Sequence, residues 1–260
     1  MKNIMKSQFL QLRKDKICYF LFFGIMIVSF IIAFLMTEPI PDDSRYTGGE
    51  EAIFGLSMFQ LLAQFFLYIF TAQACGIDFM DKTCNYEILA GHTRREVFFG
   101  RAIPTIIIST IGTLLLIAAP ISAEVFFLGG WGDKVSFTDV LARLLLMAFP
   151  ITRVTCEFIF LTFIVKNPYV VMGASYLLFI ILGMNIPVTP EHYFILGISN
   201  INAITQIDMW QSFNLSGKMF YIYETELSAE LVIPTILVSV IVGGIALLLG
   251  YTFFKNDDMN

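Results

Sequence analysis

The chain has 260 residues, of which 57% are hydrophobic and only 14% are charged, and its mean hydropathy is +0.76. Soluble domains carry about 25% charged residues, so this composition excludes an ordinary water-soluble domain and predicts a protein embedded in a membrane. The formal net charge is −5, and no basic patch with interleaved aromatic residues occurs, which argues against a nucleic-acid partner.

The residues before the first apolar stretch predict an amphipathic helix over 1–16. Met5, Phe9 and Leu12 fall on one helical stripe, and the stripe is flanked by Lys6 and Arg13. Such a helix lies on the inner membrane surface with its basic side chains near anionic headgroups, so membrane lipid is an expected partner. A positively charged flank without a function of its own is the alternative.

Six stretches are long and apolar enough to cross a bilayer, which takes about 20 residues. We therefore predict an all-α fold with one polytopic transmembrane domain that covers residues 1–260. The first stretch is longer than the apolar core of a signal peptide, which has about 7–15 residues, so we expect it to be a retained helix. The predicted spans are 17–36, 52–75, 102–122, 140–165, 168–186 and 231–254.

The distribution of basic residues predicts that both termini lie in the cytoplasm. Eleven of the sixteen Lys and Arg fall in segments on the same side as the amino terminus, and three fall in the segments on the other side. The remaining two, Arg143 and Arg153, lie inside the fourth span. Segments rich in Lys and Arg stay on the cytoplasmic side, so the opposite orientation is disfavoured.

The four cysteines match no zinc or redox spacing. None of them falls in a segment that we expect outside the cell, so we predict reduced, buried thiols. They are Cys18, Cys75, Cys84 and Cys156.

The inner segment 76–101 is the most informative part of the chain. A connector between two helices needs only a few residues, whereas this segment has about 26. It mixes both signs of charge with apolar side chains and is interrupted by Gly91. An apolar anchor with a charged rim is typical of a surface that docks a partner.

This segment resembles the loop between the second and third helices of type-2 ABC exporter permeases. The family pattern has an acidic residue, a Glu-hydrophobic-Leu element, a Ser/Thr-Arg pair and a basic residue that opens the third helix. The chain departs from it at Asn85-Tyr86, where the family often has Gly-Thr, and at His92, where it often has Pro. The matching positions are Asp78 or Asp81, then Glu87, Ile88, Leu89, Thr93, Arg94, Arg95 and Arg101.

The resemblance is closest to bacterial peptide-export and bacteriocin-immunity permeases of the cytoplasmic membrane. It implies a homodimer that moves an amphipathic or hydrophobic substrate, first of all a peptide, out of the cell. It also implies that the inner segment forms a coupling helix in a groove of an ATP-binding cassette subunit. The chain has no G-x-x-x-x-G-K-[ST] sequence, so we expect no cofactor in this chain and ATP with Mg²⁺ on the separate subunit.

The fourth span carries Arg153 and Glu157, four residues apart on one helical face, with Pro150 one turn earlier. Charges inside a membrane usually face the bundle interior and pair with one another. Either a gating or substrate-facing pair or a structural ion pair fits this pattern.

The sixth span and the segment before it carry two further patterns. Small residues at Ser239, Gly243, Ala246 and Gly250 form one ridge for close helix packing, either within the chain or with a second copy. In the long segment 187–230, which we place outside, isoleucines recur every three residues from Ile195 to Ile207. This recurrence predicts short helices on the outer leaflet.

Enzyme motifs are weak. Glu50-Glu51 resembles the paired Glu of intramembrane prenyl-type proteases, but position 55 is Gly where those enzymes need an Arg. The two histidines, His92 and His192, fall on opposite sides of the membrane and cannot form one site. We therefore expect no enzymatic activity in this chain. The main alternative to a permease is an ATPase-independent membrane immunity or assembly protein.

Overall fold

The computed structural model describes residues 1–36, 48–81, 83–127, 130–131, 136–174 and 229–256. This part of the chain is helical and has no strand, so the all-α prediction is confirmed over it. Its helices are α1 (Lys2–Lys14), α2 (Lys16–Met36), α3 (Gly48–Met80), α4 (Thr83–Leu89), α5 (Arg94–Phe127), α6 (Phe137–Val165) and α9 (Ala229–Asn256).

Five of these helices contain stretches long and apolar enough to cross a membrane, as a multi-pass membrane protein requires. They correspond to the first, second, third, fourth and sixth predicted spans. Of the predicted fifth span only residues 168–174 are described, and they are helical. The remainder of that span and the segment 187–230 lie outside the described residues. The apolar stretches are Lys16–Leu35, Leu62–Met80, Arg94–Phe127, Phe137–Val165 and Thr235–Asn256.

Two predicted boundaries are wrong, because α3 and α5 both extend into the segment that was predicted as a loop. α3 continues past Cys75 to Met80, and α5 begins at Arg94 instead of residue 102. These extra turns contain charged side chains that hydropathy assigns to a loop. The structure accommodates them by pairing Asp78 with Arg101 across the two helices.

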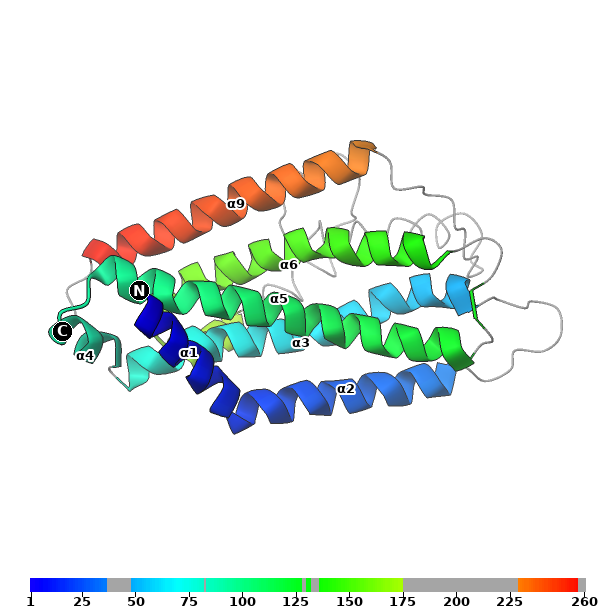
Figure 1. The fold of residues 1–260 in the computed structure, drawn as a ribbon, viewed down its shortest axis with the longest axis horizontal. Coiled ribbons are helices and arrows are strands. Elements are labelled where there is room, and N and C mark those ends of the chain that lie inside the picture. Colours follow the sequence, from blue (N-terminus) through cyan, green and yellow to red (C-terminus); the bar gives the residue numbers. More distant parts are fainter. Residues whose placement is uncertain (37–47, 82, 128–129, 132–135, 175–228, 257–260) are drawn as a thin grey trace.

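The long helices run side by side along the long axis of the molecule (Figure 1). α3 lies in the middle: 72% of its apolar stretch is buried, against 17% for α2 and 28% for α9. α2 and α9 therefore leave most of their apolar surface uncovered, which is compatible with a lipid environment. Hydroxyl pairs join α5 to α6, with 3.1 Å between the hydroxyl oxygens of Ser109 and Thr155 and the same distance between those of Thr110 and Thr152.

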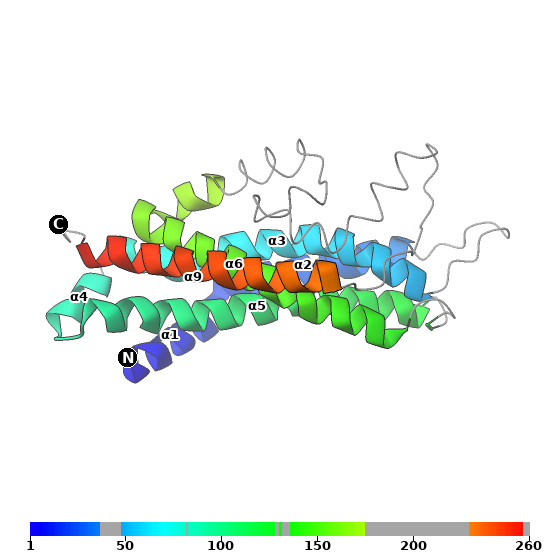
Figure 2. The same ribbon diagram turned by 90° about the horizontal axis from the view of Figure 1, so that it is seen from above.

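α1 crosses one end of the bundle beside α5, and α4 lies at that same end together with the end of α9 (Figures 1 and 2). The buried face of α1 consists of Ile4, Gln8 and Leu12, whereas Phe9 is exposed. Of the predicted stripe of Met5, Phe9 and Leu12, only Leu12 therefore belongs to the face that packs on the protein. Gly100 makes room for this contact, since a Cβ there would lie 2.8 Å from Ile4 Cγ2.

α6 has well-defined ends. Ser136 and Asp139 form a capping box, in which Ser136 N–H donates to Asp139 Oδ2 (3.1 Å) and Asp139 N–H donates to Ser136 Oγ (3.3 Å). At the other end Lys166 adopts a left-handed conformation (φ 55°), and Asn167 Oδ1 accepts the N–H of Tyr169 (3.0 Å). Only Lys166 and Asn167 therefore separate α6 from the helical residues 168–174.

The basic residues gather at one end of the bundle, where α1 and α4 lie. Among the described Lys and Arg, only Arg143 and Arg153 lie elsewhere, inside α6. The others belong to α1, the start of α2, the start of α5, the turn after α6 and the end of α9, which lie toward the end that carries α4 (Figure 1). They are Lys2, Lys6, Arg13, Lys14, Lys16, Arg94, Arg95, Arg101, Lys166 and Lys255.

Candidate functional site

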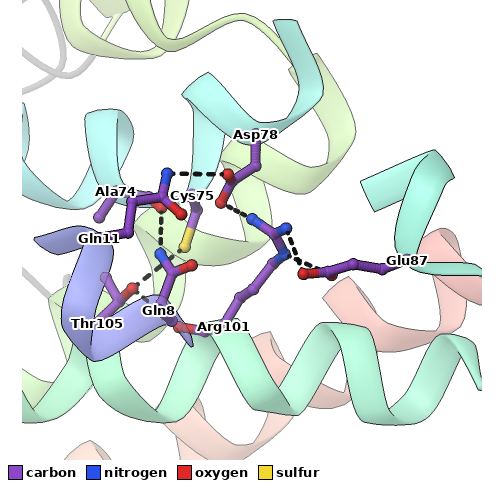
Figure 3. Close-up of polar contacts among 8 residues, drawn as sticks. All are labelled: Gln8, Gln11, Ala74, Cys75, Asp78, Glu87, Arg101 and Thr105. Atoms are coloured by element: carbon purple, nitrogen blue, oxygen red, sulfur yellow. Dashed lines mark hydrogen bonds and ion pairs between the residues drawn. The ribbon is translucent and has the colours of Figure 1, made fainter. Parts of the chain in front are cut away.

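A buried network of charged side chains lies at this end of the bundle and joins three helices (Figure 3). Arg101 of α5 forms an ion pair with Asp78 of α3, and both side chains are essentially inaccessible, at 1% and 0% exposed. The same guanidinium bonds Glu87 of α4, with 3.1 Å from Nη2 to Oε1 and 3.2 Å from Nε to Oε2. One arginine therefore links the short α4 to two of the long helices through two carboxylates.

α1 joins the same network through two glutamines. Gln11 Nε2 donates to Asp78 Oδ1 (3.2 Å), and Gln8 Nε2 donates to the carbonyl of Ala74 (2.8 Å). Burying a charge is costly unless its hydrogen-bonding groups are satisfied, and Gln11 satisfies one carboxylate oxygen of Asp78. The amino-terminal helix is thereby fixed to α3.

A hydroxyl and a thiol lie next to Arg101. Thr105 Oγ1 donates to the Arg101 carbonyl (2.9 Å), and Cys75 Sγ lies 3.6 Å from Thr105 Oγ1 (Figure 3). All four cysteines are buried and unpaired, which confirms the expectation of free thiols.

α4 has one face turned to the bundle and one face turned away from it. Cys84 is buried, and Ile88 packs on an aromatic cluster that includes Phe98, Phe163 and Phe254. Tyr86 and Leu89 are 65% and 81% exposed. α4 is thus held by its charged and buried side chains, while its largest apolar ones remain available to a partner.

Thr93 begins α5 as a capping residue. Glu96 N–H donates to Thr93 Oγ1 (3.3 Å), and Thr93 N–H donates to Glu96 Oε2 (3.2 Å). The amino group of Met1 pairs with the other carboxylate oxygen, Glu96 Oε1, at 2.9 Å. Gly91 lies between α4 and α5 and has a positive φ of 95°. This conformation favours glycine and allows the sharp reversal between the two helices.

Arg94 binds the end of another helix. Its Nη1 donates to the carbonyls of Phe254 (3.2 Å) and Lys255 (2.7 Å) in the last turn of α9. The last carbonyls of a helix have no partner within the helix and carry partial negative charge, so a guanidinium there is stabilising. Arg94 thus joins α5 to α9.

The residues of the predicted coupling element therefore separate into two groups. Glu87, Ile88, Thr93 and Arg94 hold the element together, whereas Asp81, Leu89 and Arg95 lie exposed at its surface. Of the two acidic candidates, Asp78 enters the network and Asp81 remains outside it.

Sequence reasoning missed Gln8 and Gln11 beside the network and Glu96 in the cap of α5. Gln8 and Gln11 stand three residues apart on a helix and so share a face, and this spacing is visible in the sequence. Glu96 lies three residues after Thr93, the spacing of a capping box. The pairing of Asp78 with Arg101 depends on two separate helices, and local spacing cannot reveal it.

The electrostatics of α4 follow from its partial burial. Burial raises the pKa of the Glu87 carboxyl, an effect that His92 opposes. Burial also raises the pKa of the Cys84 thiol, and the nearby Glu87 contributes in the same direction. The structure thus keeps Cys84 protonated, and such a thiol is a poor nucleophile.

The charged pair predicted in the fourth span lies where α6 meets α9. Arg153 Nε donates to Glu157 Oε1 at 2.9 Å, and the two side chains are 4% and 30% exposed. Gly243 of α9 lies against this point: a Cβ on it would be 3.4 Å from Arg153 Cα. The pair is thus part of the α6–α9 contact.

The small-residue ridge of α9 packs within the chain, on α6 and α5. Ser239 and Ala246 are buried, and a Cβ on Gly250 would lie 3.3 Å from both Phe160 Cα and Phe98 Cζ. The ridge therefore packs against helices of the same chain and not against a second copy.

Within the described ranges, no three His, Cys, Asp or Glu side chains come together as metal ligands would. Comparison with known proteins returned no matching family model, no matching curated protein and no matching solved structure.

Proposed function

We propose that the chain is the membrane-spanning permease subunit of a type-2 ABC exporter in a bacterial cytoplasmic membrane. It has six spans with both termini in the cytoplasm, works as a homodimer and takes its energy from a separate ATP-binding cassette subunit. The substrate is amphipathic or hydrophobic, with a peptide as the first candidate. The observation that carries this proposal is α4, a short helix that exposes Tyr86 and Leu89 while Glu87 binds Arg101, and Cys84 and Ile88 pack on the bundle.

The attachment of α4 suits a transmission element. Glu87 connects it to Arg101, and Arg101 connects to Asp78, so a push on α4 acts directly on α5 and α3. Bidentate contacts between a guanidinium and a carboxylate are strong and directional, which keeps such a link stiff. A loop attached only through its backbone would absorb the same motion.

The orientation is supported by the basic end of the bundle. Ten basic residues gather at the end that carries α4, and the positive-inside rule assigns such an end to the cytoplasm. This is the side on which an ATPase binds. The homodimer must use a face other than the α9 ridge, because that ridge is covered by α6 and α5.

Replacing both exposed anchors of α4, Tyr86→Ala with Leu89→Ala, should weaken binding of the ATPase at least tenfold. Buried apolar anchors contribute about 2 kcal/mol or more each at the centre of an interface. The measurement is retention of an ATP-binding cassette protein encoded beside this chain on the tagged permease, together with its ATPase rate in proteoliposomes.

The matched control is Tyr169→Ala with Val170→Ala. Tyr169 and Tyr86 are equally exposed, at 64% and 65%, and Val170 is 53% exposed, but this pair lies outside α4. The proposal holds if the α4 variant loses the ATPase and the control keeps it. Equal retention by both variants, or no retention by the unmodified chain, refutes it and favours an ATPase-independent immunity or assembly protein.

A further inference from the structure

A groove of about 730 Å³ opens on the side of the bundle where α1 meets α2. It arises because α1 and α2 diverge at Asp15, which leaves a hollow between them and the adjoining faces of α3 and α5. Its lining residues are Lys6, Phe9, Leu10, Leu12, Arg13, Cys18, Tyr19, Phe22, Phe23, Phe66, Phe70, Ile108, Ile111, Gly112 and Leu115.

The body of the groove is apolar and largely aromatic. Phe66 and Phe70 stack with their ring centroids 5.1 Å apart, and Phe22 meets Phe66 edge-on at 5.6 Å. Gly112 allows this wall to sit close to α5, because a Cβ there would lie only 2.7 Å from the Phe66 ring. Phe66 and Phe70 are almost fully buried, at 3% and 2% exposed, and form the floor of the groove, whereas Phe23, Ile111 and Leu115 are exposed along it.

Two basic side chains stand at the α1 end of this apolar surface. Lys6 and Arg13 are seven residues apart, two helical turns, and Phe9 and Leu10 lie between them on the same face. That face is opposite the one with which Ile4 and Gln8 dock α1 on the bundle. Within the described residues neither Lys6 nor Arg13 has an acidic partner, so both charges remain available.

We propose that this groove binds an anionic phospholipid, with an acyl chain against the exposed Phe23, Ile111 and Leu115 and the phosphate between Lys6 and Arg13. The volume lies in the range of small-molecule sites, about 300–1,000 Å³. Basic side chains on a surface helix attract anionic headgroups, while their aliphatic stems cover apolar surface. This site is independent of the exporter proposal and requires only that the chain lies in a membrane.

Charge and shape favour a lipid over a second copy of the chain. A two-fold contact through this groove would bring Lys6 and Arg13 of one copy towards the same cations of the other. The groove is also open along exposed side chains, such as Phe23 and Leu115, that face outward from the bundle. An acyl chain can therefore enter sideways from the bilayer.

The first experiment measures binding of dioleoyl-phosphatidylglycerol and dioleoyl-phosphatidylcholine to the full chain by native mass spectrometry from detergent. The variant Lys6→Gln with Arg13→Gln should lose the preference for the anionic lipid by roughly 10- to 30-fold. The control, Lys2→Gln with Lys14→Gln, removes the same charge from exposed positions on α1 outside the groove and should keep the preference. Equal losses in both variants would mean non-specific attraction to a basic helix and overturn the proposal.

The second experiment tests the acyl-chain part of the site. Leu115→Trp fills the groove and should reduce the number of tightly bound lipids, whereas Leu145→Trp, at a comparably exposed position on α6, should not (51% and 58% exposed). Inorganic phosphate at millimolar concentration should leave the bound lipid in place, because it lacks the acyl chain. The proposal fails if phosphate displaces the lipid, or if Leu115→Trp changes the oligomeric state and leaves lipid binding unchanged.

Discussion

Replacing Arg101 with methionine should lower the free energy of unfolding by about 3–5 kcal/mol. Arg101 and Asp78 are almost completely buried, so loss of the guanidinium leaves a carboxylate without its counter-charge. Glu87 of α4 loses the same partner. The measurement is unfolding in mixed micelles by titration with sodium dodecyl sulfate, followed by circular dichroism.

Two further variants separate the ion pair from other effects of the substitution. Arg95→Met changes an exposed arginine on the same helix and should alter the free energy of unfolding by no more than about 0.5 kcal/mol. Asp78→Leu combined with Arg101→Met removes both charges and should recover most of the loss, since a buried pair is often replaceable by apolar groups. If Arg101→Met is as stable as Arg95→Met, the network does not hold the helices together.

Gly243→Leu should destabilise the protein by about 1–3 kcal/mol, whereas Gly244→Leu next to it should be nearly neutral. A Cβ on Gly243 would meet backbone of α6, 3.4 Å from Arg153 Cα, so a larger side chain must push α9 away from α6. Nothing lies within 4 Å of a Cβ on Gly244, which faces open space. The same unfolding titration measures both variants.

Because the two glycines are adjacent, the comparison tests which face of α9 packs on α6, and the added side chain is the same in both variants. Both substitutions add the same leucine to the same helix, and leucine has a higher helix propensity than glycine. Equal destabilisation by the two variants would contradict the packing of α9 on α6. Loss of stability at Gly244 alone would place the close contact on the other face.

Hydropathy and charge were sufficient for the coarse fold. Long apolar runs must form helices in a bilayer, because their backbone groups find no water to bond. That requirement acts on each segment separately, so five apolar helices could be located without tertiary information. The helix ends could not be located in this way: α5 includes Arg94 and Arg101, whose charges are satisfied by other helices.

The candidate coupling element was recognisable from its length and its mixture of residues, but the roles within it were not. Thr93 and Arg94 belong to the matching pattern. In the structure Thr93 caps the start of α5, and Arg94 caps the end of α9. Leu89 in the same pattern is 81% exposed. Sequence spacing alone cannot distinguish a residue that attaches α4 to the bundle from one that α4 exposes to a partner. The difference depends on where the other helices lie.

The sequence by itself determined the helical class, the long apolar segments that a membrane protein requires and the segments that carry most of the basic residues. Hydrophobic length and charge are properties of single segments. Only the tertiary structure decided which charges meet. It joined Asp78 to Arg101 and Glu87, placed α9's small residues on α6, and left Lys6 and Arg13 beside an apolar groove. These are contacts between segments distant in the chain, and their partners are selected by packing.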